Sequence, residues 1–380
     1  MYGKLLIFGG IIVDPASNVN ASGDVWIDGD KISDVNSEQN SEAVTSIDVT
    51  GCYVFPGLID YHTHLFYGGT AIGVSPDLAL LPQGVTTAVD QGSAGVINFE
   101  RFMDSVVARQ TTRIFGYLHV NPTGLASLPH SPEDVDPAHY DLQQSRNLFE
   151  QYAGQLLGLK IRSSREIVKE LGLQPLRQTI HLAEQLGCRV VVHTTNPPTS
   201  VGELADLLRA GDVYTHMYQG KGSSIIADDG KLAASIRQAR ERGVIFDTAD
   251  GRAHYALSVA AAALAEGFMP DIISTDLTLG NVYDPSVFGL PFIMSKYLAL
   301  GISLADVVNA CTAAPAKLLG MEGKLGTLTP GAYADVSVFR LVKKRAQFTD
   351  FTGRSLVCEQ LLVPQLTVSH GKVVYRSLEL

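Results

Sequence analysis

At residues 56–64 the sequence reads Pro-Gly-Leu-Ile-Asp-Tyr-His-Thr-His, an apolar run that ends in two imidazoles spaced two residues apart. Alternate side chains of a β-strand share one face, so His62 and His64 would reach one metal ion from the same side. A barrel with a metal site at the ends of its strands would begin in this way. A His-x-His pair also arises by chance, so the prediction depends on the rest of the chain.

Downstream of residue 57, strand-like runs alternate with helical stretches. Counting the first, eight runs are predicted as strands, at 57–64, 84–90, 113–120, 156–161, 189–193, 212–216, 243–247 and 271–276. Apolar residues at helical spacing predict helices at 166–171, 175–186, 231–242 and 255–266. Eight strand-helix units over roughly 265 residues have the size and rhythm of a (β/α)8 TIM-type barrel, an α/β fold.

The two ends of the chain show a different pattern, in which apolar and polar residues alternate between turns. An Asp28-Gly29-Asp30 turn, for example, separates two short strand-like runs. We therefore predict one small composite β-sandwich domain, built from residues 1–55 and 322–380, beside a barrel of residues 56–321. The apolar runs 5–8 and 11–13, split by two glycines, are predicted to form a hairpin and not a signal peptide.

Composition excludes several classes of partner. With 29 basic and 39 acidic residues the net charge is -10, which provides no basic surface for a nucleic acid. The apolar runs are too short to span a membrane. Four cysteines (Cys52, Cys188, Cys311 and Cys358) lie far apart with no Cys-x-x-Cys pair, which favours reduced thiols and a cytoplasmic location. We expect a globular protein that acts on a small molecule.

Polar side chains end five of the predicted strands. They are His62 and His64 on the first strand, Lys160 on the fourth, His193 on the fifth, His216 on the sixth and Asp276 on the eighth. The carboxyl ends of barrel strands converge on one mouth, where catalytic residues lie. Each residue alone has an ordinary structural explanation, but six such placements together predict a metal site.

The types of residue indicate the metal chemistry. Imidazole and carboxylate suit zinc and similar divalent ions, and a catalytic site keeps one position open for water. Lys160 would become a ligand if its neutral amine took up carbon dioxide, because the resulting carbamate could bridge two metal ions. The alternative is a single metal held by the histidines and Asp276, with Lys160 in an ion pair.

In this order the ligands resemble those of the amidohydrolase superfamily, in its binuclear branch. The similarity is to the amidohydrolase/deacetylase group, often described as dihydroorotase-like, and it covers nearly the whole chain. It rests on residues 57–69, 84–87, 90–95, 158–160, 215–216, 273–277, 294–301 and 326–335.

The resemblance implies a role for each ligand. His62, His64 and Asp276 would hold a more buried metal, and His193 and His216 a more exposed one. A carboxylated Lys160 would bridge two divalent ions, expected to be zinc, together with a hydroxide nucleophile. Asp276 would take the proton of that nucleophile and pass it to the leaving group. An assembly of identical subunits is also compatible with the resemblance.

One segment departs from the family pattern. Where a histidine is expected directly after the seventh strand, residues 247–254 read Asp-Thr-Ala-Asp-Gly-Arg-Ala-His. The substitution either alters specificity or has no consequence. Residues that could contact the substrate are Arg162, Tyr218, Gln219, Arg252 and His254, with Arg162 either binding a substrate carboxylate or pairing with a neighbouring group.

The leading hypothesis is a metal-dependent hydrolase that removes an acetyl or other small acyl group from a carboxylic-acid metabolite. Ring opening of a cyclic amide, as in dihydroorotases and hydantoinases, is the main alternative. A mononuclear deaminase and a non-catalytic scaffold are further alternatives. The lysine at position 160 argues against the deaminase, and retention of all six ligand positions argues against the scaffold.

Overall fold

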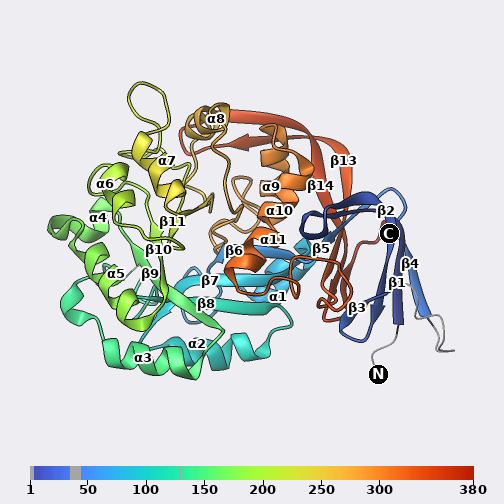
Figure 1. Ribbon diagram of the computed structural model, residues 1–380, viewed down its shortest axis with the longest axis horizontal. Coiled ribbons are helices and arrows are strands. Elements are labelled where there is room, and N and C mark those ends of the chain that lie inside the picture. The colour runs from blue at the N-terminus through green and yellow to red at the C-terminus, as the bar shows by residue number, and fades with distance from the viewer. Residues whose placement is uncertain (1–3, 35–43, 129) are drawn as a thin grey trace.

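The computed structural model describes residues 4–34, 44–128 and 130–380 (Figure 1). Within this part of the chain, seven strands form one parallel sheet, and each pairs with the next in chain order. They are β6 (Leu58–Thr63), β7 (Val85–Gly95), β8 (Arg113–His119), β9 (Leu156–Arg162), β10 (Arg189–His193), β11 (Val213–Thr215) and β12 (Ile245–Asp247). Each was predicted from the sequence.

The eighth predicted strand closes this sheet through isolated bridges. Ile272 pairs with Asp247 of β12, and Leu277 pairs with Thr63 of β6. The backbone N–H of His64 also donates to the carbonyl of Leu277, at 2.9 Å. The segment is joined to its neighbours by these bridges and not as a regular strand, and Asp276 has φ +56°, in the left-handed region, which ends the extended conformation there.

Helices surround the parallel sheet (Figure 1). They are α1 (Pro76–Leu80), α2 (Phe99–Ser105), α3 (Leu142–Gln151), α4 (Arg165–Val168), α5 (Gln174–Leu186), α6 (Val201–Asp206), α7 (Ala234–Glu241), α8 (Leu257–Ala265), α9 (Leu290–Ala299), α10 (Leu304–Ala310) and α11 (Ala313–Leu318). The helix predicted over 166–171 is broken, because Lys169 has φ +47° and only a 3₁₀ turn follows α4. Among the described residues no helix combines the length and the apolar character that crossing a membrane requires.

A second sheet joins the two ends of the chain, as predicted. Its strands are β1 (Lys4–Asp14), β2 (Val19–Asp28), β3 (Lys31–Ser33), β4 (Val44–Asp48), β5 (Tyr53–Pro56), β13 (Val336–Thr349), β14 (Ser355–Ser369) and β15 (Lys372–Arg376). The link is the antiparallel pairing of β5 with β13, and the sheet has its own apolar core. The domain boundaries given above stay a prediction.

The hairpin predicted within residues 5–13 is wrong. Both apolar runs belong to the single strand β1, which pairs with β2 along its whole length. The two glycines do not form a turn. They produce a register shift between Ile7 and Gly10, and Gly9 has φ +82°, so the strand bulges and continues.

The hairpin of β13 and β14 is longer than the sequence pattern indicated. Its arms leave the second sheet and extend across the barrel towards α8 and α9 (Figure 1). The hydroxyl of Ser295 in α9 accepts a hydrogen bond from the backbone N–H of Leu362, at 2.9 Å. The carboxylate of Asp350, in the turn, accepts one from the backbone N–H of Leu257, at 2.7 Å. These contacts connect the second sheet to the mouth side of the barrel.

Candidate metal centre

The six predicted ligands lie together at the carboxyl ends of the parallel strands. They come from β6 and the residue after it (His62 and His64), from β9 (Lys160), from β10 (His193), from the residue after β11 (His216) and from the closing segment (Asp276). All six are buried. The strands that carry them are buried along most of their length, so the candidate ligands are held within the barrel mouth and away from solvent.

The first group consists of His62, His64 and Asp276. The Asp276 Oδ1 atom lies 3.4 Å from His62 Nε2 and 3.3 Å from His64 Nε2. The Lys160 amine lies beside them, with Nζ 3.5 Å from His62 Nε2. Three donor atoms of the types that zinc prefers therefore face one another within the barrel mouth.

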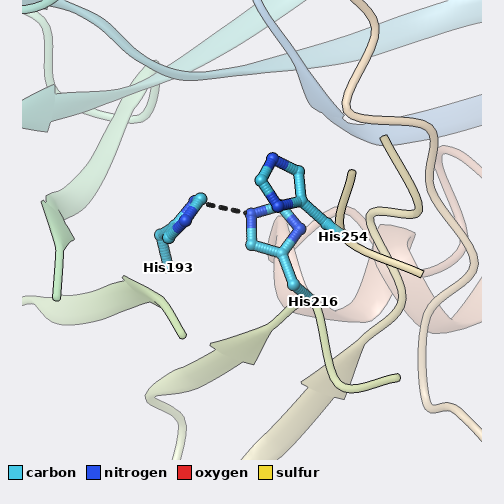
Figure 2. Close-up of side chains that lie close together, drawn as sticks. All are labelled: His193, His216 and His254. Carbon is cyan, nitrogen blue, oxygen red and sulfur yellow. Dashed lines mark hydrogen bonds between the residues drawn. The ribbon is translucent and has the colours of Figure 1, made fainter. Parts of the chain in front are cut away.

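The second group consists of His193, His216 and His254 (Figure 2). His216 Nε2 lies 2.8 Å from His193 Nδ1. Because His216 Nδ1 donates to the carbonyl of Ala249 at 2.6 Å, a neutral His216 keeps a lone pair on Nε2. That lone pair points at the ring nitrogen of His193, an arrangement that suits a shared cation. The residues present therefore fit a divalent metal ion in each group.

Outer contacts orient the rings of the first group. His64 Nδ1 forms a hydrogen bond with the hydroxyl of Ser93 at 3.0 Å, and His62 Nδ1 lies 3.4 Å from Asp247 Oδ2. Histidines that bind metals usually hold their second nitrogen in this way, which sets the tautomer and the direction of the first. Neither Ser93 nor Asp247 was predicted as a site residue, although Asp247 ends β12 as His193 ends β10.

The electrostatics of the pocket favour neutral imidazoles and a carboxylate anion. Burial, and then nearby cationic groups, hold the pKa values of His62, His193 and His216 well below the usual range. Burial also lowers the pKa of Lys160 to about 7, against the attraction of nearby carboxylates. Burial alone would raise the pKa of Asp276, but the hydrogen bond from His64 and the surrounding imidazoles lower it to about 2.

The backbone is strained where ligands are presented. His216 has φ +61° and Asp276 φ +56°, conformations that L-residues adopt rarely and that cluster at functional sites. Gly92, at φ +77°, packs against Lys160, and a Cβ atom there would lie 2.7 Å from Lys160 Cβ. Only glycine fits this position without displacing the lysine.

Three of the predicted substrate contacts have partners within the protein. Arg162 pairs with the buried carboxylate of Glu133, whose other oxygen lies 3.4 Å from His119 Nε2. Tyr218 is buried, and its hydroxyl donates to the carbonyl of Phe268 at 3.1 Å. Gln219 bonds within its own turn, donating to the carbonyl of Ser223 and accepting from the backbone of Lys221. The hydroxyl of Tyr218 and the amide of Gln219 thus form hydrogen bonds within the protein.

The altered loop after β12 divides its residues between two environments. Arg252 is exposed and lines a cleft with Ser286 and Asp350. His254 instead lies among the candidate ligands, with Nε2 3.7 Å from Asp276 Oδ2. A histidine therefore does reach the site from this loop, but it lies seven residues after the end of β12 and not directly after it.

Comparisons with known proteins show which family the chain resembles. A model of the amidohydrolase family matches residues 53–358. The chain is 34% identical over 361 residues to the deacetylase Atu3266 of Agrobacterium fabrum, covering 94% of this chain and 88% of that protein. It is 31% identical over 362 residues to a deacetylase of Brucella anthropi, covering 94% and 89%. A crystal structure of a dihydroorotase matches with a TM-score of 0.89 and 32% identity, over 99% of this chain and 98% of that one.

Proposed function

The chain belongs to the amidohydrolase family, and from this premise we propose that it removes a small acyl group, most simply acetyl, from an amide or ester of a carboxylic acid. The comparisons confirm three predictions made from the sequence: the family, the fold class and a hydrolase that acts on C–N bonds. The choice of an acyl group is supported by two relatives described as deacetylases, each similar over 94% of this chain.

The position of Asp276 carries the proposal. One of its oxygens contacts two imidazoles, at 3.3 and 3.4 Å, and the other faces His254. Its low pKa keeps it a carboxylate at neutral pH. A carboxylate anchored through one oxygen and free to accept a proton on the other is suited to act as general base and then general acid.

The metal ions would be held by the residues already described. We assign His62, His64 and Asp276 to one divalent ion, His193 and His216 to the other, and a carboxylated Lys160 between them, with zinc favoured by the donor types. Such ions, when bound, lower the pKa of water towards neutrality and polarise a carbonyl. Asp276 then takes the proton of the attacking water and delivers it to the leaving group.

Arg162 is the proposed contact for a carboxylate on the substrate. A quarter of its side chain remains exposed while it pairs with Glu133. A guanidinium carries five N–H donors in a planar fork, so it can bind one carboxylate and still present donors to a second. His119 and Glu133 would then fix the orientation of Arg162. Tyr218, Gln219 and Arg252 are not part of this proposal.

The second candidate is the opening of a cyclic amide. It is favoured by the match to the dihydroorotase structure, which is as similar in sequence as the deacetylases. The same centre would serve both reactions. A panel of N-acetyl amino acids, O-acetyl hydroxy acids and cyclic ureides, tested with metal-loaded and chelator-treated protein, separates them. Turnover of ureides alone would overturn the acyl proposal, and turnover that survives complete metal removal would overturn both.

We also propose a cytoplasmic location and a homo-oligomer. All four cysteines are free thiols in the structure, which is compatible with the proposed cytoplasmic location. A homo-oligomer stays a prediction, which analytical ultracentrifugation would test.

A further inference from the structure

His254 was expected at most to line a substrate pocket, yet it lies beside two candidate metal ligands. Its ring centroid is 4.9 Å from that of His193 and 4.3 Å from that of His216. Figure 2 shows the three side chains gathered at one point, although they come from the end of β10, the residue after β11 and the loop after β12. One donor atom from each lies within 4.8 Å of the other two.

The hydrogen bonding of His254 follows the pattern of the other rings. Its Nδ1 atom forms a hydrogen bond with the hydroxyl of Thr195 at 2.8 Å. His216 is held in the same way by the carbonyl of Ala249, and His64 by the hydroxyl of Ser93. In each case the outer nitrogen has a fixed partner and the inner nitrogen faces the centre, which is the usual arrangement of metal-bound histidines.

The inner nitrogen of His254 faces the site and not the solvent. Its Nε2 atom lies 3.7 Å from Asp276 Oδ2, so the ring also connects the second group to the first. The hydrogen bond to Thr195 occupies Nδ1, which leaves Nε2 as the atom available to a cation. The side chain keeps 20% of its surface exposed, whereas His193 and His216 are buried.

Close packing fixes the position of the loop that carries His254. Gly251 has φ +51°, and a Cβ atom there would lie 2.6 Å from Asp276 Oδ2 and 2.7 Å from His254 Cδ2. One residue earlier, Asp250 pairs with the buried amine of Lys296 and accepts a hydrogen bond from the hydroxyl of Tyr297 at 2.8 Å. The loop is therefore fixed to α9 on one side and pressed against the site on the other.

We propose that His254 is a third imidazole ligand of the metal position formed by His193 and His216. This inference rests on the proposed metal centre and adds a residue to it. The position would then hold three protein imidazoles in addition to the proposed carboxylated Lys160, and these are donor types that suit zinc. His254 is the most exposed of the three side chains.

The test is a titration of the metal-free protein with Co²⁺, followed by visible absorption and by competition with a chelator. It compares the wild type with the variants His254→Ala and His254→Gln. Loss of an outer partner alone costs about 10–100-fold in metal affinity, so we expect loss of a ligand to weaken one of the two Co²⁺ equivalents by at least about 10-fold and to change its absorption. His181→Ala, which removes an exposed histidine of α5, is the matched control and should bind as the wild type does.

The outcomes separate this inference from the proposed function. If wild-type protein binds two Co²⁺ ions and His254→Ala binds them with unchanged affinity and spectrum, His254 is not a ligand, and a raised KM would assign it to the substrate. If the wild type binds no Co²⁺, the metal centre itself fails. Should His254→Ala not fold, Thr195→Val decides, because it keeps the ring and removes only its outer partner. Unchanged Co²⁺ binding in Thr195→Val would then overturn the proposal.

Discussion

Lys296 and Asp250 form an ion pair that is closed off from solvent between α9 and the loop after β12. The Lys296 amine also lies 3.8 Å from the centre of the Tyr255 ring, and Tyr297 donates to the second carboxylate oxygen at 2.8 Å. These contacts fasten the segment that presents His254. A helix that supplies none of the proposed ligands thus determines the position of the loop beside them.

Removing the lysine should destabilise the protein strongly. Lys296→Met leaves the carboxylate of Asp250 buried without its cation, and breaking such a pair costs about 3–5 kcal/mol of unfolding free energy. Urea unfolding of the metal-loaded protein measures this cost. Arg237→Met is the control, since it breaks an exposed pair with Glu266 and should cost about 0–1 kcal/mol. Equal, small losses in both variants would contradict the prediction.

Asp276→Asn should abolish most of the activity without unfolding the protein. The amide cannot accept the proton that the carboxylate takes, and loss of general acid–base catalysis lowers kcat by about 10²–10⁴-fold. Steady-state kinetics on the best substrate of the panel, with metal content measured in parallel, tests this. Asp306→Asn is the control and should leave kcat unchanged. Asp306 is exposed in the first turn of α10, where its carboxylate accepts a hydrogen bond from the N-cap residue Ser303. An Asp276→Asn enzyme within twofold of the wild type would remove Asp276 from the mechanism.

Reconstitution with metal should depend on pH and on bicarbonate through Lys160. Its pKa of about 7 in the metal-free protein means that the neutral amine, the form that takes up carbon dioxide, increases as the pH rises from 6 to 8. The buried imidazoles are neutral throughout this range, because their pKa values are lowered. We therefore expect faster and more complete loading at pH 8 than at pH 6, with further stimulation by bicarbonate.

Lys160→Ala is the matched control for that experiment. It should lose at least one metal equivalent, as measured by elemental analysis, and should no longer respond to bicarbonate. A wild-type protein indifferent to bicarbonate, or a variant that retains both metals, would leave Lys160 without the bridging role.

Two glycines with nearly the same φ angle provide a further test. Gly92 has φ +77° and contacts Lys160, whereas Gly154 has φ +82° and no atom within 4 Å of its potential Cβ. Gly154→Ala should cost only the strain of a left-handed alanine, about 1 kcal/mol. Gly92→Ala should add displacement of Lys160, seen as loss of metal and of activity. Identical behaviour of the two variants would show that the contact with Lys160 is not needed.

Several features were predicted from the sequence because they depend on local patterns. The strand runs are short and apolar, and the polar residues at their ends follow directly in the chain, so the six candidate ligands could be identified before their arrangement was known. The hairpin within β1 was predicted wrongly for the same reason. Two adjacent glycines favour a turn locally, but pairing of β1 with β2 over its whole length favours a bulge.

Other features had no local signal. His254 lies in a loop that matches no motif, and it contacts Thr195, which is 59 residues away in the chain. Asp250 and Lys296 are 46 residues apart, and neither could be assigned a partner from its neighbours in sequence. The extension of β13 and β14 towards α8 and α9 likewise depends on contacts such as that of Asp350 with Leu257, 93 residues apart.

The sequence by itself determined the alternation of strands and helices and the residue types at the strand ends, because these follow from the periodicity of apolar side chains along the chain. Only the tertiary structure decided that His254 stands beside His193 and His216, that Arg162 pairs with Glu133, and that Tyr218 points into the core. These are contacts between distant segments. Closure of the barrel brings these segments within a few ångströms of one another, and the pattern of residues along the chain does not predict which segments will meet.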